Sequence, residues 1–304
     1  MNGTNEDRRL PLEMAAAIKP AGATTPATRP DAAAATGKTE GITAAGNSVS
    51  SGPNGAMISV RDLRKKIDEE EILRGVDLDV AVGETLVIIG RSGGGKSVLL
   101  KNLIGLMRPE RGEIWIAGQN IIGMSERQLG SVRQKVGILF QSGALFDSMT
   151  VEDNIAFPLI EAGMRSPNAI RARVNEVLEV VELEGENVKM PESLSGGMRK
   201  RVGLARAIIR RPSCVLYDEP TSGLDPVVSD NINRLIRRLQ HRFGMTSIVV
   251  THDMKSATQV GDHIAYLHEG RIYFYGTPEE LTRCQDPIIQ DFLQGRSEST
   301  PRQN

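Results

Sequence analysis

Residues 90–97 read Gly-Arg-Ser-Gly-Gly-Gly-Lys-Ser, and this stretch decides the fold. The apolar run from Thr85 to Ile89 precedes it and is typical of a buried parallel strand, while the residues from Val98 to Met107 are apolar at helical spacing. Between a strand and a helix, glycines let backbone N–H groups surround a phosphate, and the helix adds the positive end of its dipole. We therefore expect Lys96 to reach the β- and γ-phosphates of a nucleotide and the Ser97 hydroxyl to bind Mg²⁺, rather than a glycine-rich turn that binds nothing.

The composition is that of an ordinary globular protein. The chain has 304 residues, of which 39% are hydrophobic and 25% charged, and its formal net charge is -1. This balance gives no electrostatic case for nucleic acid as a partner. The two cysteines, Cys214 and Cys284, lie far apart and form no metal-binding spacing, which favours a reducing compartment. No run reaches the roughly 18 apolar residues of a membrane span, so a role at a membrane is expected through a partner, from the cytoplasmic side.

The pattern along the chain predicts three parts. Residues 1–56 are rich in Ala, Thr, Gly and Pro without a lasting apolar period, and we expect a disordered tail. Residues 57–284 are expected to form one α/β domain, which begins with antiparallel strands at 57–60 and 72–80 and carries a helical insert at about 150–195. Repeated alternation of strands and helices predicts a mainly parallel sheet covered on both faces. Residues 285–304 are expected to form a C-terminal extension, with a short helix at 287–293 and a polar tail.

A carboxylate pair follows a second apolar strand. The run Val215-Leu216-Tyr217 leads into Asp218 and Glu219. At the end of a buried strand, Asp218 can hold Mg²⁺ beside the phosphates through water, and Glu219 can orient or deprotonate the water that attacks the γ-phosphate. The alternative is a solvated acidic turn, since such turns often carry these residues.

A second phosphate-binding element lies at residues 194–198, Leu-Ser-Gly-Gly-Met. Ser195 is a good N-cap, and Gly196 and Gly197 permit close approach of the backbone to an anion at the start of a helix. The first loop already surrounds one triphosphate, so within a single copy the second element would have no phosphate to bind. If two copies pack head to tail, the second element of each copy can bind the nucleotide held by the other.

With these motifs together, residues from Met57 to Leu281 resemble an ATP-binding cassette (ABC) subunit, the ATPase of an ABC transporter. The resemblance implies a P-loop core with an antiparallel β subdomain and a helical insert, and hydrolysis of ATP with Mg²⁺. It also implies that Gln141 links the nucleotide to the insert, that Ser222-Gly223-Leu224-Asp225 crosses a dimer interface, and that His252 contacts the γ-phosphate. It assigns catalytic roles to Glu219, His252 and Gln141, nucleotide contacts to Gly90, Arg91, Ser92, Gly93, Gly94, Gly95, Lys96, Ser97, Ser195, Gly196, Gly197 and Asp225, and metal contacts to Ser97, Gln141 and Asp218.

Two residues depart from the family pattern. Met198 stands where many ABC proteins have Gln, but Ser195 and the backbone N–H groups are retained, so we expect function to survive. Ile67 stands where the family usually places an aromatic residue against adenine, and no aromatic residue precedes Trp115. Because Ile67 offers no π-face, stacking of roughly 1–3 kcal/mol is expected to be absent or supplied by another residue. We expect a weak preference for ATP over GTP, well below about a hundredfold.

Within the ABC family, the chain is similar to the ATPases of Mla/Mce lipid-transport systems. The similarity rests on residues 140–159, on the Leu-Ser-Gly-Gly-Met string and on residues 286–295. It implies three partners: a second copy of the chain, an integral membrane permease and an Mce-type substrate-binding protein, at the cytoplasmic face of the inner membrane. The apolar patch from Ala144 to Phe146 is expected to receive a permease helix. Two alternatives stay open: the ATPase of another importer or exporter, for amino acids or metal ions, and a non-transport ABC ATPase acting on ribosomes or DNA.

Overall fold

The computed structural model describes residues 41–42, 48–49 and 55–296. Most of the expected N-terminal tail and the last residues, 297–304, lie outside this range. Within the tail, strands β1 (Gly41–Ile42) and β2 (Ser48–Val49) pair antiparallel. All the elements discussed below fall between residues 55 and 296.

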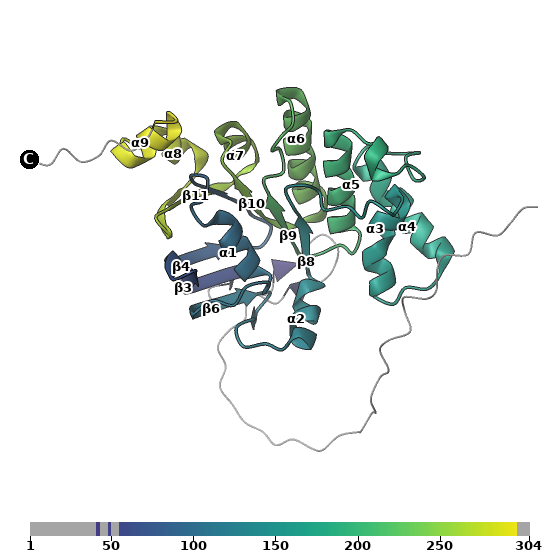
Figure 1. Ribbon diagram of the computed structural model, residues 1–304, viewed down its shortest axis with the longest axis horizontal. Helices are drawn as coiled ribbons and strands as arrows, with labels where there is room; N and C mark the ends of the chain where they lie inside the picture. Colours follow the sequence, from purple (N-terminus) through teal and green to yellow (C-terminus); the bar gives the residue numbers. More distant parts are fainter. Residues whose placement is uncertain (1–40, 43–47, 50–54, 297–304) are drawn as a thin grey trace, which may run out of the picture. The chain divides into compact units, whose positions relative to one another are not determined.

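A six-stranded sheet forms the centre of this part of the chain (Figure 1). Its strand order is β12 (Arg271–Gly276), β11 (His263–His268), β5 (Thr85–Ile89), β10 (Thr246–Thr251), β9 (Cys214–Asp218) and β8 (Val136–Leu139). Every neighbouring pair from β11 to β8 is parallel, and only β12 runs antiparallel to its neighbour. The expected mainly parallel sheet is confirmed, whereas β11 and β12 were not foreseen individually.

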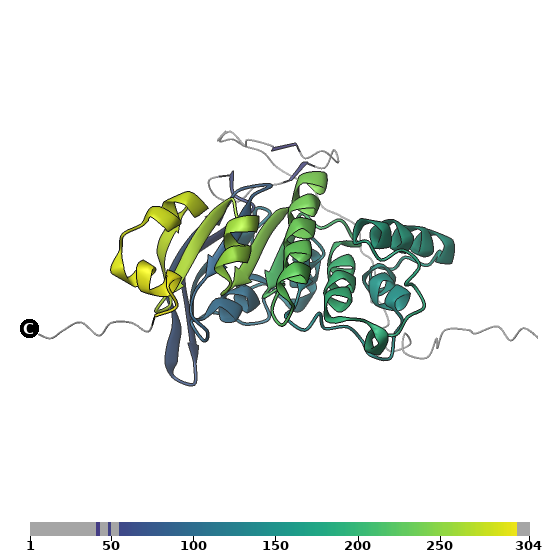
Figure 2. The ribbon, with the colours of Figure 1, turned by 90° about the horizontal axis from the view of Figure 1, so that it is seen from above.

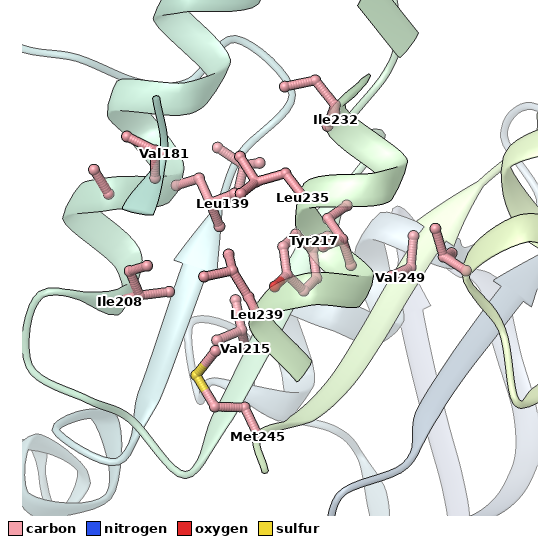
Figure 3. Close-up of a cluster of buried hydrophobic side chains, with 14 of the residues drawn as sticks. Leu139, Val181, Ile208, Val215, Tyr217, Ile232, Leu235, Leu239, Met245 and Val249 are labelled. Atoms are coloured by element: carbon pink, nitrogen blue, oxygen red, sulfur yellow. The ribbon is translucent and has the colours of Figure 1, made fainter. Parts of the chain in front are cut away.

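Both faces of the central strands β5, β10 and β9 are buried, and alternate residues of these strands enter two different hydrophobic clusters. Val215 and Tyr217 of β9 face one cluster together with Val249 of β10, as Figure 3 shows. Cys214 and Leu216 face the other. Continuous apolar sequences therefore suit these central strands, because both of their faces are covered.

Helices α5 (Gly196–Ile208), α6 (Pro226–Phe243) and α7 (Met254–Val260) cover the face of Val215 and Tyr217. The opposite face packs against α1 (Lys96–Leu103), α2 (Glu126–Arg133) and a second, antiparallel sheet. That sheet has the order β4 (Glu70–Val80), β3 (Ile58–Ile67), β6 (Arg111–Ile116) and β7 (Gln119–Asn120), which confirms the two antiparallel strands expected near the start. The sheets meet where the Arg74 N–H donates to the Gly270 carbonyl at 2.8 Å.

A helical segment, α3 (Val151–Glu161) and α4 (Pro167–Val180), lies between β8 and β9 in the sequence, followed by the 3-10 turn Pro191–Ser193. Thr150 and Asp153 form a reciprocal cap at the start of α3. Pro158 lies inside α3, which continues three residues beyond it to Glu161, so it does not cap the helix. Proline removes one backbone donor, and burial of Ile155 and Leu159 on either side of it keeps the helix packed.

The C-terminal helices α8 (Pro278–Arg283) and α9 (Pro287–Leu293) lie at the β12 end of the sheet, and the helical segment lies at the β8 end (Figures 1 and 2). Helix α9 matches the short helix expected at 287–293. Its Phe292 ring lies 4.7 Å from the ring of Tyr266 on β11. None of the helices in the described ranges has the length and apolar character that crossing a bilayer requires.

Candidate functional site

The site forms where four parallel strands end at one edge of the sheet. Strands β5, β10, β9 and β8 point the same way, so the residues that follow them are neighbours. These residues are the loop from Gly90, then His252, the pair Asp218 and Glu219, and Gln141. Four motifs that are separate in the sequence are thereby brought together.

The phosphate-binding loop has the backbone that its glycines permit. Gly93 has φ +79 with no heavy atom within 4 Å of a Cβ position, so its surroundings are open. Gly95 has φ +96 and caps α1, and a Cβ there would press on Ile72 and Leu73 at 3.2 Å. Open space at the mouth of the loop and close packing behind it fit a cradle for a phosphate.

Lys96 lies folded into this loop. Its Nζ donates to the carbonyls of Gly90 at 2.7 Å and Arg91 at 2.9 Å. Burial lowers the pKa of Lys96, against the opposing effect of the Glu219 and Asp218 carboxylates. The amine is thus held beside the loop by hydrogen bonds to neutral carbonyls. A bound phosphate can replace these partners, because its negative charge makes the hydrogen bond stronger.

Ser97 and Asp218 provide oxygen ligands suited to Mg²⁺. The Ser97 Oγ donates to Asp218 Oδ1 at 3.2 Å, which joins the start of α1 to the end of β9. Burial raises the pKa of Asp218, and the hydrogen bond from Ser97 opposes this rise. Hydroxyl, carboxylate and phosphate oxygens are the donors that Mg²⁺ prefers, so these residues fit the ion. No cluster of three or more His, Cys, Asp or Glu that could bind a metal occurs among residues 55–296.

Glu219 is held by both its backbone and its carboxylate. It adopts φ +48, a left-handed conformation that is unusual for a residue with a Cβ, and its N–H donates to the Val250 carbonyl at 2.9 Å. Oε1 lies 2.9 Å from His252 Nδ1, and Oε2 accepts from Thr251 Oγ1 at 3.3 Å. The structure therefore brings the predicted base and the predicted switch histidine into direct contact. Thr251 was not foreseen, since a threonine ending a strand carries no signal of its own.

Gln141 lies on the same edge, where its Nε2 donates to Ser222 Oγ at 3.3 Å. Lys200 of α5 contacts the backbone of this residue, and the sequence did not predict Lys200 as part of the site. The Lys200 Nζ donates to the backbone carbonyl of Gln141 and, at 3.0 Å, to that of Glu219. A buried lysine thus joins the loops that follow β8 and β9.

The second phosphate-binding element begins α5 as expected. Ser195 Oγ accepts from the Met198 N–H at 3.2 Å, and Ser195 is exposed. Gly197 is tightly packed, because a Cβ there would lie 2.5 Å from Val228. Asp225 caps α6, accepting from the N–H groups of residues 227 and 228 at 3.0 Å. Between residues 55 and 296 no hydrogen bond links Ser195, Gly196 or Gly197 to the loop at 90–97.

Fold and site together define a nucleoside-triphosphate hydrolase of the P-loop class, in which the glycine-rich start of α5 is not hydrogen-bonded to the loop at 90–97 within the described residues. The model of the ABC transporter family matches residues 73–222. The chain belongs to this family, and it is an ATPase.

Proteins of known sequence and structure agree with this assignment. The chain is 44% identical over 244 residues to the probable ribonucleotide transport ATP-binding protein mkl of Mycobacterium leprae, covering 80% of this chain and 70% of the relative. It is 40% identical to the intermembrane phospholipid transport system ATP-binding protein MlaF of Haemophilus influenzae, covering 82% of this chain and 94% of MlaF. The dimeric ATP-binding cassette MJ0796, solved in a post-hydrolysis state with ADP and Pi, superimposes with a TM-score of 0.68 at 33% identity, covering 73% of this chain and 99% of that one.

Proposed function

We propose that this ATPase drives a lipid transporter of the Mla/Mce type, and that it works as a head-to-tail dimer on a membrane permease. The observation that carries the mechanism is the pairing of Glu219 with His252 at the edge where Lys96, Ser97 and Asp218 meet. The cargo is supported by similarity along 94% of MlaF, a phospholipid transport protein. A chloroplastic plant protein named trigalactosyldiacylglycerol 3 is also 38% identical over 256 residues.

Each residue of the site has a distinct role in the proposed hydrolysis of ATP. The backbone of the loop at 90–97 binds the phosphates, and Lys96 moves from its carbonyl partners to the β- and γ-phosphates. Mg²⁺, held by Ser97, Asp218 and Gln141, would neutralise charge on the phosphate oxygens. Glu219 takes a proton from the attacking water, and His252 holds the carboxylate in place through the 2.9 Å contact.

The second copy completes each site. Ser195, Gly196 and Gly197 present a hydroxyl and helix N–H groups at an exposed edge, and Asp225 lies in the adjacent loop. In the dimer these groups are expected to bind the γ-phosphate held by the partner, so that hydrolysis weakens the contact. The MJ0796 cassette, which is similar over nearly its whole length, is dimeric with ADP and Pi.

A groove beside the site fits a permease helix. It has a volume of about 470 Å³ and is lined mostly by apolar side chains of α1, α2, β8, α3 and α5. At its rim Phe146 is 42% exposed and packs on Phe157 at 5.0 Å, with the Arg206 guanidinium 5.7 Å from the Phe146 ring. Ala144 and Phe146 of the expected patch line this groove, whereas Leu145 packs against the buried core. A permease bound here would hold the ATPase at the cytoplasmic face of the inner membrane and connect it to an Mce-type protein.

Two measurements test this proposal. Glu219→Gln should slow hydrolysis by a factor of about 10³ while ATP still drives dimer formation in size-exclusion chromatography with light scattering. A variant that hydrolyses ATP at the parental rate would remove Glu219 as the base.

The cargo is tested by purifying the chain with its permease from native membranes and measuring ATPase activity in proteoliposomes. Phospholipid, presented with the Mce-type protein, should stimulate hydrolysis, whereas methionine should not. Methionine is the relevant alternative because the import protein MetN of Carboxydothermus hydrogenoformans is 39% identical over 241 residues. Stimulation by methionine alone would replace the lipid proposal. Phe146→Glu should abolish co-purification without lowering the ATPase rate of the isolated dimer.

A further inference from the structure

Lys200 occupies an unusual position for a charged side chain. It lies in the second turn of α5 and is only 5% exposed. A buried ammonium group is unfavourable unless polar groups surround it, and here its Nζ donates to the backbone carbonyls of Gln141 and Glu219. The two carbonyls belong to different loops, and each loop carries a residue of the site.

The contact with Glu219 matters because of that residue's backbone. A left-handed φ of +48 turns the peptide out of the geometry of β9, so the Glu219 carbonyl leaves the sheet and points to α5. The carboxylate of the same residue contacts His252 and Thr251. A donor on the carbonyl therefore fixes the conformation that places the carboxylate.

Helix α5 connects this point to two other surfaces. Ser195, at its N-cap, lies five residues before Lys200, and Arg206 lies six residues after it, so the three span roughly 16 Å at 1.5 Å per residue. Arg206 donates to the Gly143 carbonyl at 3.0 Å and lines the groove proposed for the permease. A Cβ on Gly203 would lie 3.1 Å from the same carbonyl, so the helix is packed closely on the loop after Gln141.

We infer that Lys200 is a positioning residue for Glu219, which ties the helix that contacts the partner's nucleotide to the hydrolytic site of its own subunit. Ser195, which is expected to bind the partner's γ-phosphate, and Lys200, which holds the Glu219 backbone, lie on the same helix. This inference rests on the proposed role of Glu219 as the base.

Lys200→Met tests the inference in the full-length dimer. The methionine keeps the length and burial of the side chain but removes the ammonium donor from both carbonyls, so that the Glu219 carbonyl keeps the Ser222 N–H at 3.2 Å and loses its link to α5. The turnover number should fall by about 10–100-fold, the usual effect of losing a group that orients a catalytic residue, while KM for ATP stays within about threefold. Lys200→Arg, which retains a donor able to reach both carbonyls, should recover most of the turnover.

The decisive measurement repeats Lys200→Met in a Glu219→Gln background, with residual hydrolysis followed in single-turnover reactions. If Lys200 acts through Glu219, the second substitution should change the residual rate by less than about twofold, because the carboxylate that it positions is already gone. Arg201→Met provides the matched control, since Arg201 is a neighbouring cation on α5 that pairs instead with Glu182 at 2.9 Å. It should alter turnover by less than about twofold in either background.

The outcomes separate the two proposals. An equal loss of rate in both backgrounds would show that Lys200 acts independently of the Glu219 carboxylate, and parental turnover in Lys200→Met would show that it does not position Glu219. Either result overturns the inference while leaving Glu219 as the base. Parental turnover in Glu219→Gln alone would instead overturn the proposed function.

Discussion

Gly137 on β8 is the position where a single methyl group should disturb the packing of α5 on the sheet. A Cβ at this glycine would lie 2.4 Å from the Ala207 carbonyl oxygen and 3.2 Å from the Pro212 side chain. The first distance is about 1 Å shorter than ordinary van der Waals contact, and the blocked atom is backbone, which no rotamer change can move. We therefore place Gly137→Ala at the upper end of the range for overpacking, about 3 kcal/mol of lost unfolding free energy.

For a domain of this size, that loss corresponds to a fall in melting temperature of about 6–12 °C. Gly130→Ala is the matched control, since Gly130 lies inside α2 with nothing within 4 Å of a Cβ. There alanine should raise stability by about 0.5–1 kcal/mol through helix propensity. Urea unfolding followed by circular dichroism, with calorimetry of the same samples, measures both. The reasoning fails if Gly137→Ala melts within about 2 °C of the parent, or if both substitutions shift the melting temperature the same way.

Three further expectations follow from single residues. Ile67→Tyr should lower the Kd for ATP about fivefold or more by adding a stacking surface, whereas a hundredfold preference of the parent for ATP over GTP in competition binding would contradict the role given to Ile67. Iodoacetamide should label the half-buried Cys284 but not Cys214, because burial raises the pKa of the Cys214 thiol, and mass spectrometry should find Cys214 modified only after unfolding in urea. Asp225→Ala should lower the unfolding free energy by about 0.5–2 kcal/mol by removing the cap of α6, and Asp225→Ser should restore most of it; equal melting temperatures for all three proteins would exclude the capping role.

Much of the site could be predicted from the sequence because its residues follow local rules. The run from Gly90 to Ser97 needs only a strand before it and a helix after it to form a phosphate cradle. Asp218 and Glu219 could be expected at the site because a carboxylate pair ends a buried strand, whereas the role of His252 was implied only by the resemblance to ABC subunits.

Lys200 could not be predicted in the same way. It lies between two other basic residues, Arg199 and Arg201, and the sequence does not reveal which of the three turns inward. The rotation of α5 is set by close contacts with the loop at Gly143, and these depend on tertiary packing.

The left-handed backbone at Glu219 sets thermal stability against hydrolytic activity. Such a conformation is strained by about 1–3 kcal/mol in a residue with a Cβ, and glycine or asparagine adopts it more readily. Selection of variant libraries for heat resistance alone should therefore enrich those residues at position 219, and the survivors should have lost their hydrolytic activity. The proposed role of Glu219 as the base gives the reason why a strained peptide is retained at this position.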